Sequence, residues 1–254
     1  MELNYKVFGE IGEDVIIIHG LLGSLDNFQT IAKQLSDTYR VWLLDMRNHG
    51  SSFHSDEMNY EVMAKDVHEF MEMHQLSHAH IVGHSMGGKV AMNFALIYPD
   101  LVDDLIVVDI GPKEYEGDHQ VILRTMLETN LKDYTERRAI ENVISEKIHS
   151  KKIVQIMMKN LGRNKNDFFW KPNVEVILNS YRLLMSNVPK DSVFKGNTVF
   201  IKGENSDYIE VEDLEEFRKY FPEAQMITVP NAGHWVHADQ PKVFLQLLNK
   251  ILNN

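Results

Sequence analysis

Ser85, in the stretch IVGHSMGG at residues 81–88, is the residue of this sequence best suited to covalent chemistry. The letters GHSMG fit the pattern G-x-S-x-G, in which a serine occupies a sharp turn between a strand and a helix. Such a turn strains the serine backbone, and the crowding leaves room only for glycine two positions before and after it, here Gly83 and Gly87. The helix that follows begins with backbone N–H groups that have no partner within the helix. The pattern therefore predicts a serine nucleophile beside donors for negative charge.

A base for this serine is offered by His234, in the stretch NAGHWVHAD. A serine hydroxyl is a poor nucleophile until its proton is removed, and an imidazole titrates in the range that this requires. A carboxylate must then orient the imidazole, in the chain order Ser, Asp, His. Both Asp109 and Asp207 satisfy this order, so the residues alone leave two candidates for the acid.

Two backbone N–H groups are predicted to receive the negative charge that develops on the substrate oxygen. One belongs to Met86, directly after the serine, and the other to Leu21, in the HGLLGS turn. Loss of one such donor typically costs about 3 to 4 kcal/mol of transition-state stabilisation.

Metal chemistry is not expected, although the chain has 12 histidines. The pairs His49 with His54 and His234 with His237 are the most suggestive. However, the sequence has no HExxH spacing, no cysteine and no cluster of paired carboxylates to complete a site. We therefore expect no metal ion.

The elements that must position these residues are short β-rich runs that alternate with longer segments of helical period. This alternation predicts an α/β fold, with a mostly parallel twisted sheet flanked by helices. Helical periodicity marks the segments from Met63 to His74 and from Val243 to Ile251. Residues 86–98 are predicted as another helix, which Pro99 ends. The predicted strands cover residues 15–18, 41–44, 80–82, 105–108, 198–201 and 225–229.

The residues that follow these strands should meet at one place. In an open parallel sheet, ligands bind beyond the carboxyl ends of the strands. Ser85 follows the third predicted strand, Asp109 the fourth, Asp207 the fifth and His234 the last. A serine, a histidine and a choice of carboxylates are therefore expected at one edge of one sheet.

The stretch between Gly111 and about Lys195 has no strand-like runs and is dominated by helical patterns. We predict an α/β core formed by residues 1–112 and 196–254, with residues 113–195 as a helical cap, or lid, inserted into it. The chain has no Gly/Ser linker that would let this insertion swing freely, so it should pack on the core. Its methionines and aromatic residues favour ordinary helix packing. The alternative is a lid whose apolar underside holds a substrate chain.

The composition limits the partners and the location. With 26 basic and 37 acidic residues the net charge is -11, which opposes binding to nucleic acid. Its apolar runs are shorter than the roughly 20 residues of a membrane span. The absence of cysteine and a start, MELNYKVFGE, without features of a signal peptide lead us to expect a cytoplasmic location. The oligomeric state is left open.

Five stretches together resemble the α/β-hydrolase superfamily, and within it the bacterial acyl esterases of the YbfF type and their mitochondrial relatives. These stretches are HGLLGSLDNF, DMRNHGSS, GHSMGGKVAM, VVDIGP and PNAGHWVHADQP. The resemblance covers residues 13 to about 113 and about 197 to 252, and leaves the insertion unmatched. It implies hydrolysis of carboxylic esters through an acyl-enzyme, with short or medium acyl groups or acyl thioesters of coenzyme A as substrates, and without a cofactor.

The resemblance also bears on the identity of the acid. Most of the superfamily has an aspartate after the penultimate strand, where this chain has Ser206, with Asp207 one residue later. The YbfF-type proteins resemble this chain in having Asn-Ser there, and draw the carboxylate from the strand after the nucleophile helix. VVDIGP supplies that carboxylate as Asp109, which the resemblance therefore favours.

Two other functions are compatible with the same fold. A lyase such as the menaquinone-pathway synthase also has a serine on this turn, but it would need several arginines in its pocket. Only Arg47 lies in one of the matched stretches. The other alternative is a non-catalytic protein that uses the pocket for binding; the joint presence of serine, histidine and carboxylate argues against it.

Overall fold

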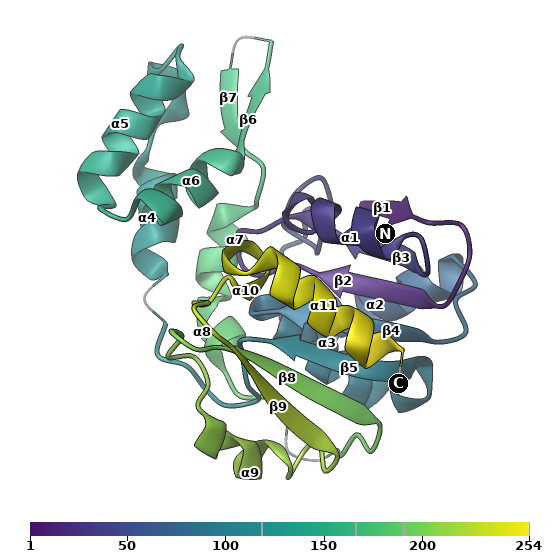
Figure 1. The fold of residues 1–254 in the computed structure, drawn as a ribbon. Helices are drawn as coiled ribbons and strands as arrows, with labels where there is room; N and C mark the ends of the chain where they lie inside the picture. The colour runs from purple at the N-terminus through teal and green to yellow at the C-terminus, as the bar shows by residue number, and fades with distance from the viewer. Residues whose placement is uncertain (118, 166, 190–191, 254) are drawn as a thin grey trace.

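The computed structural model describes residues 1–117, 119–165, 167–189 and 192–253. Its centre is a seven-stranded sheet in the order β1-β3-β2-β4-β5-β8-β9 (Figure 1). All neighbouring strands are parallel except β1, which runs antiparallel to β3 at one edge. The strands are β1 Tyr5–Phe8, β2 Asp14–Ile18, β3 Arg40–Leu44, β4 Ala79–His84, β5 Val102–Val108, β8 Asn197–Gly203 and β9 Ala224–Val229.

All six strands predicted from the sequence are present in this sheet. Strand β1 was not predicted, because its four residues YKVF are mixed in polarity and only partly buried at the sheet edge. The mostly parallel sheet flanked by helices confirms the predicted fold class.

Helices cover both faces of the sheet (Figure 1). Alternate residues of β2 separate into two cores, since Ile16 and Ile18 face the side of α2 and α3, whereas Val15 and Ile17 face the side of α1 and α11. Each fully buried aliphatic side chain stabilises the fold by about 1.5–3 kcal/mol. The helices of this part are α1 Gln29–Leu35, α2 Tyr60–Met73, α3 Met86–Ile97, α9 Leu214–Phe217, α10 Val236–Asp239 and α11 Pro241–Leu252, with short 3-10 turns at Leu25–Asn27, Pro99–Leu101 and Val211–Asp213.

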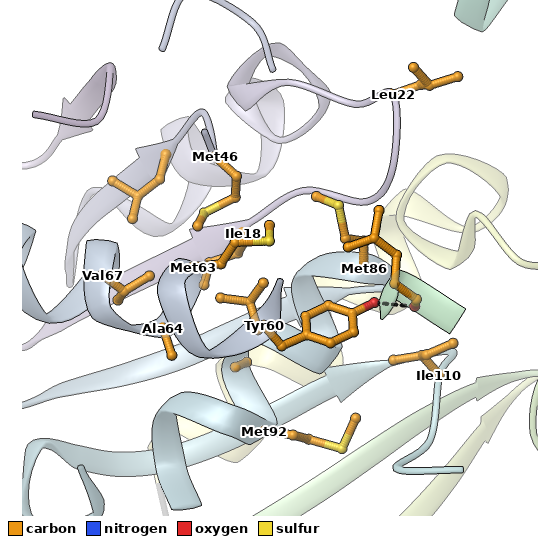
Figure 2. Close-up of a cluster of buried hydrophobic side chains, with 14 of the residues drawn as sticks. Ile18, Leu22, Met46, Tyr60, Met63, Ala64, Val67, Met86, Met92 and Ile110 are labelled. Carbon is orange, nitrogen blue, oxygen red and sulfur yellow. Dashed lines mark hydrogen bonds between the residues drawn. The ribbon is translucent and has the colours of Figure 1, made fainter. Parts of the chain in front are cut away.

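The larger core extends from the sheet to the residues that adjoin Ser85. Figure 2 shows the ring of Tyr60, at the start of α2, close to Met86 and Ile110. The Tyr60 hydroxyl donates a hydrogen bond to the backbone oxygen of Leu184 at 2.6 Å. This contact joins the core to the inserted segment between β5 and β8.

We call residues 113–195 the cap segment. The predicted helical patterns correspond to α5 and to the pair α7 and α8, which are separated at Ser180. Figure 1 shows α4, α5 and α6 gathered at one end of the molecule, beyond the sheet. The elements are α4 Gln120–Glu128, a 3-10 turn Leu131–Asp133, α5 Arg137–Lys147, α6 Lys151–Lys159, β6 Leu161–Asn164, β7 Asp167–Trp170, α7 Val174–Asn179 and α8 Tyr181–Met185.

The β6–β7 hairpin corrects the expectation that this segment contains no strand. The two strands pair antiparallel, with Leu161 opposite Trp170. Each strand has only four residues, and the aromatic run Phe168 to Trp170 was assigned to helix packing. Aromatic residues are also frequent in strands, so composition alone did not separate the two outcomes.

The cap segment is hydrogen-bonded to the core at several places. The Asn173 N–H donates to the Asn48 oxygen at 3.0 Å, and the His54 ring donates to the Lys171 oxygen at 2.9 Å. None of the described helices is both long and apolar enough to cross a membrane.

Candidate active site

Ser85 occupies a strained turn between β4 and α3. Its backbone angles are φ 52° and ψ -118°, and positive φ is unfavourable for any residue with a Cβ. Such a conformation costs on the order of 1–3 kcal/mol and persists only where the surroundings enforce it. The Ser85 N–H continues the sheet by donating to the Val108 oxygen at 3.0 Å. The turn thus brings the serine side chain out at the carboxyl end of the sheet.

The glycines around Ser85 permit this turn. A Cβ on Gly83 would lie 2.2 Å from the Gly87 oxygen, and a Cβ on Gly87 would lie 2.4 Å from the Ile18 oxygen. Both neighbours are backbone atoms and cannot rotate away. At Gly88, a Cβ would instead meet the side chain of Ile110 at 2.5 Å. The three glycines allow α3 to pack directly against the sheet.

Ser85, His234 and Asp109 form a continuous hydrogen-bonded series. The Ser85 Oγ lies 3.0 Å from His234 Nε2, and His234 Nδ1 lies 2.8 Å from Asp109 Oδ2. Because an ionised carboxylate can only accept, His234 donates from Nδ1, which leaves Nε2 free to accept the serine proton. This is the arrangement in which an imidazole acts as a general base.

Asp109 is the carboxylate that contacts His234. It follows β5 and is fully buried, and its Oδ1 accepts a hydrogen bond from the Gly203 N–H at 2.8 Å. Asp207 is instead exposed at the edge of a neighbouring cavity, with no hydrogen bond to His234 in the described part of the chain. The structure therefore brings together Ser85, His234 and Asp109, and leaves Asp207 apart from them.

Two residues after β8 complete the surroundings of His234, and the sequence analysis gave neither a role. The Ser206 hydroxyl donates to Asp109 Oδ2, the oxygen that also accepts the hydrogen bond from His234 Nδ1. The ring of Tyr208 stacks on the imidazole of His234 with the centroids 3.8 Å apart and the planes at 16°. Tyr208 had no sequence signal beyond its place after a predicted strand end, whereas Ser206 also belongs to the Asn-Ser pair that the YbfF-type proteins share. Together they restrict the position of both the carboxylate and the imidazole.

His84 is hydrogen-bonded to the loop that carries His234. Its Nε2 lies 2.8 Å from the His234 backbone oxygen, which can only accept, so the Nε2 of His84 carries a proton. Burial, together with the nearby His237 and His234, lowers the pKa of His84 well below its usual value. The ring is therefore neutral near pH 7 and acts as a hydrogen-bond donor of fixed tautomer.

Leu21 and Met86, whose backbone N–H groups are the candidate oxyanion donors, line a cavity together with Ser85. Met86 is the first residue of α3, so its N–H has no acceptor within the helix. Leu21 belongs to a turn that is closed by a hydrogen bond from the Gly23 N–H to the Gly20 oxygen at 2.9 Å. Within the described residues the Leu21 N–H has no acceptor. Both groups can therefore donate to a ligand.

Two cavities meet at Ser85. The first, which we call the α6 cavity, has a volume of about 320 Å³ and extends toward Ile153, Ile156 and Asn160 of the cap segment. The second, the Tyr60 cavity, has a volume of about 400 Å³. Volumes of 300–1,000 Å³ are typical of small-molecule sites. The side chains of the Tyr60 cavity are mainly apolar or aromatic, and include Tyr60, Met86, Ile110, Leu184, Met185 and Tyr208.

Lys89, one turn after Ser85 on α3, is a buried residue that the sequence analysis did not single out. Its Nζ donates to the backbone oxygen of Lys113 at 2.8 Å and to that of Ser186. Burial lowers the pKa of Lys89 to about 7. Since Lys113 and Ser186 belong to opposite ends of the cap segment, this one side chain joins both ends to the helix of the nucleophile.

No group of three or more His, Cys, Asp or Glu side chains that could hold a metal ion occurs among the described residues. Burial instead lowers the pKa of both His49 and His237 to about 3. The ring of His49 packs against His19, and that of His237 packs against Phe28. These histidines thus belong to the packing around the site.

Comparison with known proteins agrees with this architecture. The family model described as alpha/beta hydrolase fold matches residues 15–139. Esterase YbfF of Escherichia coli is 30% identical over 241 residues, which cover 94% of this chain and 93% of that protein. The sn-1-specific diacylglycerol lipase ABHD11 of Danio rerio is 33% identical over 255 residues, which cover 96% of this chain and 80% of that protein.

A solved structure agrees along the whole chain. The marine microorganism esterase superimposes with a TM-score of 0.95 at 40% sequence identity, and the match covers 98% of each chain. The resemblance stated from five short stretches thus extends over nearly all residues, including the cap segment that those stretches left unmatched. The protein belongs to the α/β-hydrolase fold family, among the relatives of the YbfF esterase.

Proposed function

We propose that this protein is a serine esterase that hydrolyses small carboxylic esters through an acyl-enzyme. The observation that carries the proposal is the hydrogen-bonded series from Asp109 through His234 to Ser85, beside the two available N–H groups of Leu21 and Met86. The relatives named as an esterase and as a diacylglycerol lipase, both of which act on esters by name, support it.

In the first half of the reaction, Ser85 Oγ attacks the ester carbonyl while His234 Nε2 accepts the hydroxyl proton. The carbonyl oxygen becomes an oxyanion, which the N–H groups of Leu21 and Met86 stabilise. Asp109 keeps His234 in the required tautomer and stabilises the imidazolium. The tetrahedral adduct then expels the alcohol, which takes its proton from His234, and the acyl group remains on Ser85.

In the second half, a water molecule attacks the acyl-enzyme with His234 as the base. Collapse of the second tetrahedral adduct releases the carboxylic acid and returns the proton to Ser85. The same steps apply to a thioester, with a thiol in place of the alcohol. Acyl thioesters of coenzyme A and esters of short or medium acyl chains are the substrate classes that we propose.

The two cavities support a substrate with groups on both sides of the reacting bond. Both are lined by Leu21, Ser85 and His234, so a carbonyl held at the serine can extend one substituent into each. We propose that residues 113–195 act as a cap that encloses these substituents. Among the described residues, no arginine lines either cavity. The cavities therefore lack the several arginines that a lyase of the menaquinone-pathway type needs.

The substitution Ser85→Ala tests the proposal. It removes the nucleophile and leaves the rest of the site, so hydrolysis of p-nitrophenyl butyrate should fall by a factor on the order of 10⁶. Circular dichroism should show an unchanged fold, which serves as the control. Wild-type and variant rates should also be compared across p-nitrophenyl esters and coenzyme A thioesters of rising acyl length, and equal rates for the two proteins would refute the proposal.

A further inference from the structure

The cap segment reaches the turn that carries Leu21 through one buried side chain. Asn160 follows the last residue of α6 and is 4% exposed. Its side-chain Nδ2 donates to the backbone oxygen of Leu22 at 2.7 Å and to that of Ile156 at 3.0 Å. Leu22 directly follows Leu21, so this amide connects the cap segment to the residue next to a candidate oxyanion donor.

The turn of Leu21 and Leu22 needs such a restraint. Leu22 has φ 56°, in the left-handed region that glycine and asparagine tolerate and that a leucine avoids. In a turn closed from Gly23 to Gly20, this residue occupies the third position, where positive φ is characteristic of a type II turn. Residues held in this way relax unless the surrounding structure prevents it. Relaxation of Leu22 would rotate the Leu22–Gly23 peptide, whose N–H donates to the Gly20 oxygen. Because the Gly20 oxygen and the Leu21 N–H belong to the same peptide, the Leu21 N–H would then lose its fixed direction.

Asn160 is itself held firmly enough to act as an anchor. Its backbone N–H donates to the Met157 oxygen at 3.0 Å, and its backbone oxygen accepts from the Lys171 N–H at 2.9 Å. Both hydrogens of its side-chain amide are used, one toward α6 and one toward the turn. Asn160 is therefore held to the cap segment through both its backbone and its side chain.

A ligand in the α6 cavity would lie against α6, the helix that Asn160 follows. Ile153 and Ile156, about two turns and one turn before the end of α6, line this cavity together with Asn160 and Leu22. A group bound there packs on α6, whose end holds the turn. Helix α6 thus connects the α6 cavity with the turn that carries Leu21 and Leu22.

We propose that Asn160 is a positioning residue for the oxyanion hole: by holding the Leu22 oxygen, it keeps the Leu21 N–H directed at the reacting carbonyl. This inference rests on the proposed esterase function. Asn160 does not touch the reacting atoms, and it acts through the backbone of the turn. The cap segment then contributes to transition-state stabilisation as well as to substrate enclosure.

Two substitutions of similar size test the inference. Asn160→Leu and Asn160→Asp both remove the donor to the Leu22 oxygen, and the second keeps the shape of the side chain. Removal of an oxyanion donor costs about 10²–10³-fold in kcat. Displacement of one donor should cost less, so kcat for p-nitrophenyl acetate should fall by about 10–100-fold with KM within about twofold of wild type. Affinity for a trifluoromethyl ketone, whose adduct carries the oxyanion, should fall by a similar factor.

The matched control is His54→Ala, which removes another hydrogen bond between the cap segment and the core, at an exposed residue away from the reacting groups. Its kcat and its ketone affinity should stay within about twofold of wild type. Active-site titration normalises all rates, so loss of folded protein is not mistaken for loss of catalysis.

The outcomes separate the two proposals. A wild-type protein without activity on any ester or thioester would overturn the esterase function itself. An active wild type, with an Asn160→Asp protein of equal kcat and equal ketone affinity per titrated site, would overturn only the role of Asn160. A loss of thermal stability without a change in kcat would also overturn it, because that is the signature of a purely structural residue.

Discussion

Asp109 is held by several hydrogen bonds, whereas Asp207 is exposed. This difference predicts that Asp109 is the carboxylate required for catalysis. Asp109 accepts hydrogen bonds from His234, Gly203 and Ser206 inside the protein. An aspartate-to-asparagine change at the acid of such a triad lowers kcat on the order of 10⁴-fold, since the imidazole is then held in the wrong tautomer.

We therefore expect Asp109→Asn to lower kcat for p-nitrophenyl butyrate by several orders of magnitude. Asp207→Asn, the matched change at the exposed carboxylate, should stay within about threefold, as expected for a solvated surface group. Steady-state kinetics of the two purified variants makes the comparison. A large loss in the Asp207 variant with a small loss in the Asp109 variant would reverse the assignment.

At this scale the sequence could predict residue types but not all contacts. Ser85 was predicted from the glycine pattern, and His234 from its place after the last strand. Residue order alone left Asp109 and Asp207 open, because the choice depends on which strand end lies beside the histidine loop. The roles of Ser206 and Tyr208 depend on the path of the loop after β8, which has no local pattern that specifies it. The catalytic roles themselves remain predictions.

At the scale of elements, the junction of β4 and α3 determines where the nucleophile lies. β4 and α3 can approach closely because Gly87 and Gly88 have no Cβ, but the atoms that a Cβ would meet differ between the two positions. At Gly87 the obstacle to a Cβ is the Ile18 backbone, which belongs to the central strand β2. At Gly88 the nearest atom is the Cγ2 methyl of the Ile110 side chain at 2.5 Å, and the nearest backbone atom, the Gly83 oxygen, is farther away at 3.1 Å.

This contrast predicts different costs for the same substitution. Overpacking typically destabilises by about 1–3 kcal/mol, and Gly87→Ala should lie at or above the upper end of that range. Gly88→Ala should lie near the lower end. Urea unfolding gives both free energies of unfolding, and ester hydrolysis by the folded fraction reports the position of Ser85. Equal destabilisation by the two variants would contradict the proposed packing.

Elements with strong periodicity were predicted from the sequence, and short ones were not. The buried parallel strands, the almost fully buried helix α3 and the amphipathic helices α2 and α11 are long enough to be recognised from the sequence. Strand β1 and the β6–β7 hairpin have four residues in each strand, and their formation depends on the neighbouring strand rather than on their own composition.

For the molecule as a whole, the buried histidines predict a dependence of stability on pH. Burial lowers the pKa of His49 and His237 to about 3, and the pKa values of His19 and His84 are also lowered. Below pH of about 6.5 the unfolded chain binds protons at these residues, whereas the folded protein does not. The free energy of unfolding should therefore fall as the pH decreases from about 6.5 toward 4.

The expected slope is about 1.4 kcal/mol per pH unit for each extra proton bound by the unfolded chain. Urea unfolding near pH 7 and near pH 5 measures it, and His237→Gln should make the slope smaller. The control is His78→Gln. The hydrogen bond to Asp103 raises the pKa of this exposed histidine, so its contribution to the free energy of unfolding increases as the pH falls, opposite to that of His237. A slope that His237→Gln leaves unchanged would show that this residue is not neutral in the folded protein.

The most direct test of the central claim, that Ser85 is an activated nucleophile, is covalent labelling with a fluorophosphonate followed by mass spectrometry. We expect one phosphonate on each chain, attached to Ser85, with loss of ester hydrolysis in proportion to labelling and no label on Ser85→Ala. A phosphonate found on a different residue, or a fully labelled protein that still hydrolyses p-nitrophenyl butyrate at the wild-type rate, would contradict it.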